Sequence, residues 1–235
     1  MYNKNMVTFK EDTHQYFNEK GEEYISGTTF LHKFQKPFDE DKFASLKAKK
    51  LGVSVNEVKA MWKANSRKAC DHGTNIHLLM ENYVLHGTRE EGYSNLYESF
   101  NLITTEDFIK ALKVYSEELL WVDEYKVAGT ADLIIEHNDY EFSVGDFKTN
   151  KSIDFCSKYG DRLLDPISHL SDCNYNLYCL QLSLYAYLFS LRTGKKCRKI
   201  FLMHLKDDKW NYIPGNYMEY EVRMMLKWYK KNILQ

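Results

Sequence analysis

Hydrophobic and polar positions alternate most clearly between residues 129 and 151, where the pattern predicts two β-strands joined by a tight loop. One face of the second strand carries, in order, Tyr140, Phe142, Val144, Asp146 and Lys148. These residues share a face because successive strand side chains point to opposite sides of a sheet. The face therefore begins apolar, as a core requires, and ends with two charged side chains.

The length of the loop decides which residues of this hairpin face each other. If residues 138–140 form a three-residue loop, Ile134 lies opposite Val144 and Asp132 lies opposite Asp146. Two carboxylates directly opposed across a sheet repel each other, so the arrangement favours a cation between them. The pair predicts a metal site.

Patterns on either side of the hairpin predict a chain of mixed strands and helices. The expected strands are residues 7–9, 15–17, 23–25, 121–127, 199–205 and 210–213. The expected helices are residues 28–34, 39–51, 54–85, 106–120, 175–192 and 217–234. Ser54 and Glu57 fit a capping box at the start of the long helix. Residues 155–173 are expected to form a loop with short helical turns.

The composition agrees with one globular α/β domain. The 235 residues are 44% hydrophobic and include only 3 prolines, which suits a single domain over residues 1–235 with a substantial core. Within it we expect N-terminal strands and basic helices (1–70), a central core (71–205), and a C-terminal strand and helix (206–235). The chain has neither an apolar run of membrane-spanning length nor a secretory signal at its N-terminus, so we expect no membrane contact and a cytoplasmic location.

Cysteine usage and net charge exclude some classes of function. The 5 cysteines include no Cys-x-x-Cys pair, which argues against a disulfide framework and against a structural zinc site. They are most simply free thiols. The net charge of −1 gives no overall attraction to phosphate, so any binding of nucleic acid must depend on local patches.

Two successive helices carry the candidates for such a patch. Their basic residues are Lys42, Lys47, Lys49, Lys50, Lys59, Lys63, Arg67 and Lys68. They form either ordinary solvated helix faces or a basic wall, which matters only if it borders a site. Residues 44–62 also resemble a helix-turn-helix, which leaves open a DNA-reading role for this segment.

The long helix offers a metal ligand to the carboxylate pair. His77 and Glu81 lie four residues apart on one helical face, and Gly73 lies one turn earlier, where a missing side chain permits a close approach. Imidazole is a common ligand for transition metals. The alternative is a hydrogen-bonded histidine at a contact between helix and sheet.

Two further groups fit the same site. Gln181 and Tyr185 share a face of the apolar helix and could contact a phosphate, a base or water near a metal, or could simply be polar groups at the edge of the core. Lys148 lies two residues beyond Asp146. It could stabilise negative charge on an attacked phosphate, or form an ordinary ion pair with that aspartate.

In order along the chain, the motifs are Gly73-x-x-x-His77, Gly129-x-x-Asp132, Asp146-x-Lys148 and Gln181-x-x-x-Tyr185. Together they resemble the RecB-like branch of the PD-(D/E)XK nucleases over residues 70–190. The small phage and mitochondrial single-strand exonucleases of this branch are also similar in the N-terminal pattern, which comprises His14-x-Tyr16, Gly21, Ser26-Gly-Thr-Thr29, and Trp62 before Gly73-Thr74. The helix over residues 178–187 looks phage-like, and the resemblance implies a stand-alone enzyme in a bacterial or phage-infected cell.

The resemblance implies a restriction-endonuclease-like core, in which helices flank a mixed sheet. It implies that a divalent metal is held by His77, Asp132, Asp146 and the carbonyl of Phe147. Lys148 would position the attacking water, with Asp132, Asp146 and Lys148 as the catalytic set. Gln181 and Tyr185 would contact DNA or the surroundings of the site, and Glu81 would hold a metal-bound water. Some relatives bind an iron-sulfur cluster through one cysteine before the core and several after it; the cysteines here do not match, so we expect no cluster.

We therefore expect a Mg²⁺- or Mn²⁺-dependent deoxyribonuclease acting as an exonuclease on single-stranded ends. Carboxylates, a carbonyl and one imidazole suit these two metals. The alternatives are a toroidal duplex-end exonuclease of the lambda-exonuclease type and a non-catalytic nucleic-acid-binding module. The sequence leaves open the polarity of cleavage, whether the substrate is DNA or RNA, the number of metal ions and the oligomeric state.

Overall fold

The computed structural model describes residues 6–10, 13 and 15–234, so His14 of the N-terminal pattern lies outside the described residues. The strands of the described chain are β1 (Val7–Lys10), β2 (Gln15–Asn18), β3 (Glu23–Ser26), β4 (Lys113–Val122), β5 (Val127–Glu136), β6 (Glu141–Lys148), β7 (Lys196–Lys206) and β8 (Lys209–Gly215). The helices are α1 (Gly27–His32), α2 (Glu40–Leu51), α3 (Val55–His86), α4 (Ser94–Ile109), α5 (Asn174–Thr193) and α6 (Glu219–Asn232).

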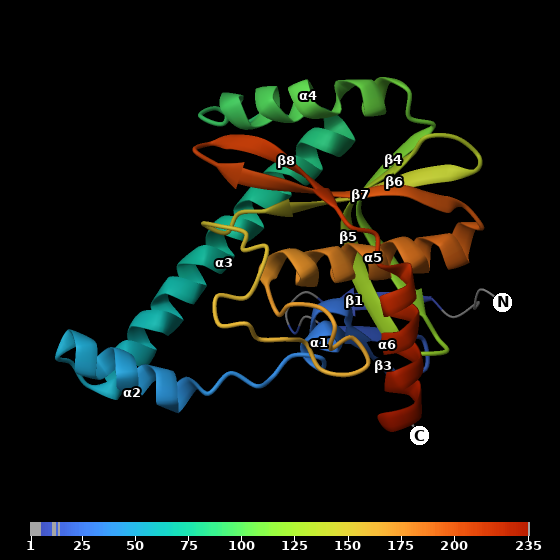
Figure 1. Ribbon diagram of the computed structural model, residues 1–235. Helices are drawn as coiled ribbons and strands as arrows, with labels where there is room; N and C mark the ends of the chain where they lie inside the picture. Colours follow the sequence, from blue (N-terminus) through green and yellow to red (C-terminus); the bar gives the residue numbers. More distant parts are fainter. Residues whose placement is uncertain (1–5, 11–12, 14, 235) are drawn as a thin grey trace.

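The strands form one mixed sheet with helices on both faces (Figure 1). Its order is β1-β2-β3-β5-β6-β7-β8, and β4 pairs with the other edge of β5. The β5–β6 hairpin is antiparallel, whereas α5 crosses from β6 to a parallel β7. The expected mixed sheet with a small N-terminal β element is confirmed.

The register of the central hairpin is confirmed. Ile134 pairs with Val144 and Leu133 with Gly145, so the next position along both strands sets Asp132 opposite Asp146. The N–H of His137 donates to the carbonyl of Glu141 at 2.9 Å and closes the three-residue loop. Loop length and alternation were sufficient to fix this register because a slip of one residue would turn every buried side chain of the hairpin to the other face.

Two apolar cores lie on the two faces of the sheet. Helices α1, α5 and α6 cover one face and bury, among others, Phe142, Val144, Leu184, Phe189 and Met225. The C-terminal half of α3 and helix α4 cover the other face and bury, among others, Ile76, Met80, Phe100, Phe147 and Met203. Within the described chain, no helix combines the length and the apolar character that a membrane span requires.

The expected helix at residues 106–120 and the expected strand at 121–127 are wrong. Helix α4 ends at Ile109, and residues 113–122 are strand β4. This strand pairs with β5 along its whole length, from Lys113 opposite Glu136 to Val122 opposite Val127. Residues 123–126 are a turn. The apolar spacing around residues 108–120 fits a helix locally, but ladder pairing along the whole of β5 outweighs that local preference.

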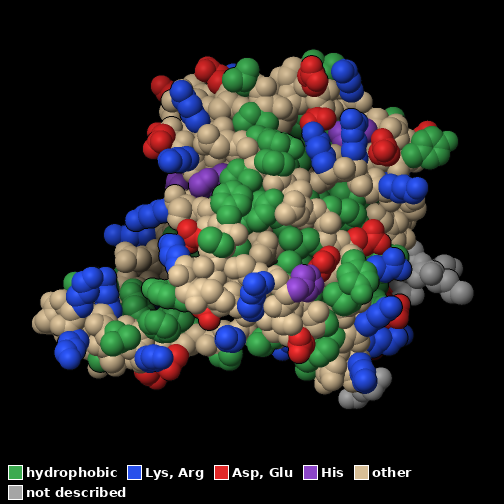
Figure 2. All heavy atoms as spheres, viewed as in Figure 1, with side chains coloured by type: hydrophobic (Ala, Val, Ile, Leu, Met, Phe, Trp, Pro, Cys, Tyr) green, Lys and Arg blue, Asp and Glu red, His purple; other side chains and the backbone are tan. Residues whose placement is uncertain are grey.

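Helix α2 and the first half of α3, residues 40–72, project from the body of the molecule as an arm (Figures 1 and 2). The expected capping box is confirmed: Ser54 accepts from the N–H of Glu57 at 3.2 Å, and the Glu57 carboxylate accepts from the N–H of Ser54 at 2.7 Å. Gly52 has a φ of 68° and ends α2 in the left-handed conformation that glycine adopts readily. Ala44, Ala48 and Val58 form the small core of the arm.

Candidate metal centre

The site lies where β5 and β6 separate. The ladder of β5 with β3 ends at Ala128, and its ladder with β6 begins at Leu133. Between them, Oδ2 of Asp132 accepts the N–H of Phe147 at 2.8 Å. A carboxylate thus takes the place of a strand carbonyl, which fixes Asp132 at the opening between the strands.

Helix α3 brings His77 to this opening. Its Nε2 lies 3.0 Å from the carbonyl oxygen of Phe147, which can only accept, so Nε2 carries a proton. Nδ1 then faces two carboxylates, at 3.4 Å from Oδ2 of Asp132 and 3.6 Å from Oε1 of Glu117. At Gly73, one turn earlier, a Cβ would lie only 3.3 Å from Oγ1 of Thr149, so a side chain comes close to this glycine.

Glu117 is the residue that the sequence reasoning missed. It lies opposite Asp132, between the ladder pairs Ser116–Leu133 and Glu118–Ala131. Its φ of 50° is left-handed, a conformation that costs a residue with a side chain roughly 1–3 kcal/mol inside a strand. Identifying β4 as the strand beside Asp132 would have placed Glu117 at the site, although its backbone conformation has no signal in the sequence.

His77, Glu117 and Asp132 form a group that could hold a metal ion. One ligand atom from each lies within 4.8 Å of the others. Two ligands of one ion, each about 2.1–2.3 Å from it, lie at most about 4.6 Å apart, so a small adjustment of side chains suffices. One imidazole and two carboxylates suit a divalent cation.

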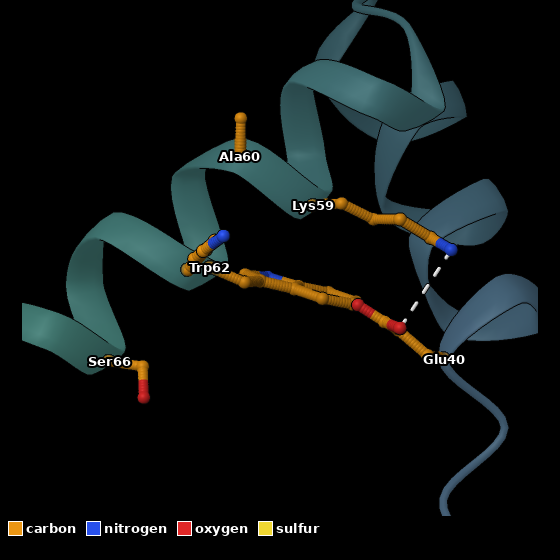
Figure 3. A pocket seen from close by; sticks show the side chains of 6 residues that line it. Glu40, Lys59, Ala60, Trp62 and Ser66 are labelled. Atoms are coloured by element: carbon orange, nitrogen blue, oxygen red, sulfur yellow. Dashed lines mark ion pairs between the residues drawn. The ribbon is translucent and has the colours of Figure 1, made fainter. Parts of the chain in front are cut away.

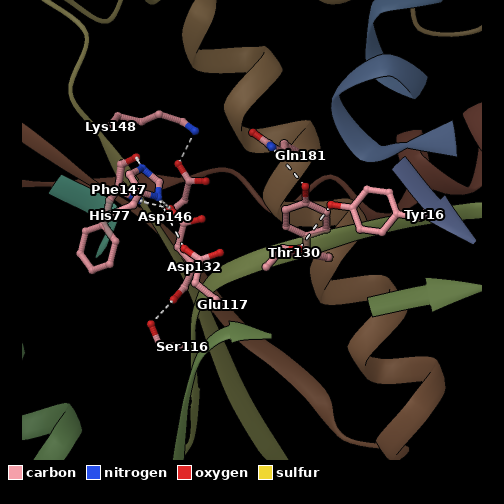
Figure 4. A network of polar contacts seen from close by, with 11 residues as sticks. Tyr16, His77, Ser116, Glu117, Thr130, Asp132, Asp146, Phe147, Lys148 and Gln181 are labelled. Carbon is pink, nitrogen blue, oxygen red and sulfur yellow. Dashed lines mark hydrogen bonds and ion pairs between the residues drawn. The ribbon is translucent and has the colours of Figure 1, made fainter. Parts of the chain in front are cut away.

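Asp146 and Lys148 form a buried ion pair beside this group (Figure 4). Nζ of Lys148 lies 2.6 Å from Oδ2 of Asp146, and the two side chains are 17% and 4% exposed. The same Nζ lies 4.7 Å from the ring centre of Tyr178 on α5. The carboxylate and the aromatic ring therefore hold the ammonium group at the edge of the opening.

Burial and mutual charge displace the pKa values of these groups. Burial raises the pKa of Asp146 to about 6, although the ammonium of Lys148 opposes the shift, and the charge of Asp132 adds to it. The pKa of Asp132 is also raised, by burial and by the charge of Glu117, against the attraction of His77. Burial opposes the charged form of His77, but the surrounding carboxylates prevail and raise its pKa to about 9. The site therefore favours a cation, either a proton on His77 or a metal ion.

Gln181 lies on α5 near the charged group (Figure 4), and Tyr185 follows one turn later on the same helix. Nε2 of Gln181 donates to the hydroxyl of Tyr185 at 3.2 Å, and burial raises the pKa of that phenol. The Tyr185 ring packs on Gly129, where a Cβ would lie 2.6 Å from it. The glycine of the Gly129-x-x-Asp132 motif thus makes room for this ring.

Glu81 lies one turn beyond His77 on α3 and is half-buried. Among the described residues, the group suited to a metal ion contains Glu117 instead of Glu81. A role for Glu81 in holding a metal-bound water stays a prediction.

No protein-family model matches the sequence, and no curated protein matches it. Among solved structures, SSO0001 is 18% identical and the match covers 90% of this chain and 76% of that chain, with a TM-score of 0.38. A candidate exonuclease from Eubacterium rectale is 11% identical, with 90% of this chain and 79% of that chain covered and a TM-score of 0.39. Backbone overlap this low decides neither the fold nor the function.

Proposed function

We propose that this chain is a divalent-metal-dependent deoxyribonuclease that removes nucleotides from single-stranded ends. The observation that carries the proposal is the gathering of three carboxylates, from Glu117, Asp132 and Asp146, around one imidazole and one ammonium group at the opening between two strands. Like charges in a buried place are unfavourable unless a cation joins them. The order of the motifs along the chain supports the same assignment.

The donor set fits Mg²⁺ or Mn²⁺. We assign Nδ1 of His77 and the carboxylates of Glu117 and Asp132 as ligands, with Asp146 completing the set. The sequence had instead suggested the carbonyl of Phe147 as a ligand. Nε2 of His77 donates to the carbonyl of Phe147. We therefore assign this carbonyl the role of orienting the imidazole, as hydrogen-bond partners of metal-bound histidines commonly do.

When bound, such an ion polarises a phosphoryl oxygen and lowers the pKa of a coordinated water. In the hydrolysis, the oxygen of water attacks phosphorus and one bridging P–O bond breaks. The departing oxygen keeps the electron pair of that bond and takes up a proton, while the attacking water releases one proton to the surrounding water. Lys148 stabilises the negative charge that develops on the phosphate, because Asp146 and Tyr178 hold its ammonium group in place.

The test is degradation of end-labelled single-stranded DNA, duplex DNA and RNA by the purified protein with Mg²⁺, Mn²⁺ or EDTA. We expect stepwise release of nucleotides from single-stranded DNA with either metal, no release in EDTA, and loss of activity in Asp146→Asn. Asp139→Asn, in the exposed hairpin loop, is the matched control and should remain active. Degradation in EDTA, or full activity of Asp146→Asn, would refute the proposal.

A further inference from the structure

The arm and the segment that leads into it at Phe38 expose aromatic side chains that a folded protein usually covers. The rings of Phe38 and Phe43 stack at 5.0 Å with an interplanar angle of 7°, and Trp62 lies 6.2 Å from Phe38. Phe38 is 66% exposed and Phe43 is 42% exposed, while Trp62 is half-buried. Stacked rings that stay in contact with water have unused flat faces on which another ring can lie.

Trp62 stands between two hollows of the arm. One hollow of about 350 Å³ is lined by Phe38, Phe43, Leu46, Lys47, Lys50 and Trp62. The other, of about 450 Å³, is lined by Glu40, Lys59, Ala60, Trp62, Lys63 and Ser66 (Figure 3). Both hollows therefore combine an aromatic side chain with lysine side chains.

The charge of the arm is far from that of the whole chain. The arm, residues 40–72, contains eight lysines and arginines and four acidic residues, Glu40, Asp41, Glu57 and Asp71, which gives it a net charge of +4, whereas the whole chain has a net charge of −1. Acidic residues at the start of α2 offset part of this charge, since Glu40 and Asp41 pair with Lys59 at 3.8 and 2.7 Å. The basic side chains next to the apolar hollow are visible in Figure 2. The surplus of positive charge favours a polyanion as the occupant.

We propose that this aromatic surface, formed by Phe38, Phe43, Trp62, Lys47, Lys50 and Lys63, is a second binding site for single-stranded nucleic acid. Bases stack on the rings and phosphates lie against the lysines, the combination with which proteins hold single strands without reading their sequence. A duplex keeps its bases stacked inside and offers no free face to the rings. The inference rests on the proposed function, because it gives the same substrate a second contact.

Helix α3 connects this surface to the metal centre. Trp62 precedes His77 by 15 residues on one continuous helix, which at about 1.5 Å per residue separates them by roughly 22 Å. At the stacked spacing of about 3.4 Å per nucleotide found in a duplex strand, roughly seven nucleotides span that distance, and an extended single strand spans it with fewer. One long strand can therefore occupy both sites.

The test measures binding of nucleic acid in EDTA by the full chain carrying Asp146→Asn, so that no cleavage occurs. Because binding is measured and not cleavage, the result is valid even if the chain proves not to be a nuclease. A fluorescein-labelled oligothymidylate of about 20 nucleotides and a duplex of about 20 base pairs are the probes. We expect Phe38→Ala and Trp62→Ala to weaken binding of the long strand about tenfold each. Binding of the duplex should change much less.

Two controls keep the result interpretable. Trp62→Phe retains an aromatic face and should bind nearly as well as the parent, which separates stacking from local unfolding of the arm. Tyr220→Ala removes an equally exposed ring, 70% exposed on α6, and should leave binding unchanged. Equal binding of the long strand by Phe38→Ala, Trp62→Ala and the parent would overturn the proposal. So would weaker self-association of these variants with unchanged binding, because that result assigns the surface to contacts between protein copies.

Discussion

The two halves of α3 place charge in opposite surroundings. Around His77 the helix packs on the sheet, and carboxylates and an ammonium group are buried within a few ångströms of one another. Between residues 63 and 72 the helix is exposed all round, and its basic side chains project into solvent. Buried charges interact strongly and are weakly screened, whereas exposed charges are screened by salt over about 10 Å. The same helix thus carries a site of strong, fixed interactions and a surface of weak, additive ones.

Two lysines offer the sharpest test of this difference. We expect Lys148→Ala, at the buried pair with Asp146, to lower the single-turnover rate about 10²- to 10³-fold, because it removes a fixed charge beside the attacked phosphate. We expect Lys63→Ala, on the exposed arm, to weaken binding only a few-fold and to reduce the slope of log K against log salt by about 1.

Single-turnover cleavage and strand binding, each measured over a series of salt concentrations, separate the two effects. The loss in Lys148→Ala should persist at high salt, whereas the loss in Lys63→Ala should disappear. Equal salt dependence of the two variants would show that the two regions do not differ as proposed.

The central hairpin could be predicted from the sequence down to its register, because alternation and loop length act within twenty residues of chain. The first three strands, the capping box and the long helix could be predicted for the same reason: their signals are local. The mixed sheet flanked by helices was expected from the resemblance of the motifs to a nuclease family, not from local signals. Local signals could not show which strand pairs with the other edge of β5, beside Asp132.

That gap explains the error at the site. Residues 113–122 become a strand only through pairing with β5, so Glu117 was read as part of a helix and left out of the ligand set. The orientation of His77, with Nε2 toward Phe147 and Nδ1 toward the carboxylates, depends on how a helix docks on a sheet. The stacking of Phe38 on Phe43 depends on a loop without periodicity meeting α2. Each is a tertiary contact between segments that carry no mark of it in their own sequence.

Glu117 therefore provides the second test, which concerns metal binding without catalysis. In thermal unfolding, Mn²⁺ at about 100 times its dissociation constant should stabilise the parent by about 2.7 kcal/mol. For a chain of this size that corresponds to a rise in Tm of roughly 5–10 °C. We expect Glu117→Gln to lose most of this rise, because the amide contributes no charge to the group formed with His77 and Asp132.

Asp139→Asn is again the control, and its Tm should respond to Mn²⁺ as the parent does. If Glu117→Gln responds fully while Asp146→Asn does not, the ligand set first expected from the sequence is correct and ours is wrong. Loss of the response in both variants fits a set that contains both carboxylates.

The smallest expected effect concerns how the buried lysine is held. The ring centre of Tyr178 lies 4.7 Å from Nζ of Lys148. Replacement by leucine keeps an apolar side chain but removes the attraction between ring and cation, which is worth roughly 0.5–2 kcal/mol. We expect Tyr178→Leu to lower kcat about three- to tenfold with little change in KM, because Lys148 becomes less well positioned while strand binding through the arm is untouched.

Tyr178→Phe keeps the ring and should restore most of kcat, and Tyr187→Leu, elsewhere on α5, should behave as the parent. If leucine and phenylalanine at position 178 lower kcat equally, the hydroxyl of Tyr178 acts by itself and the ring does not position the lysine.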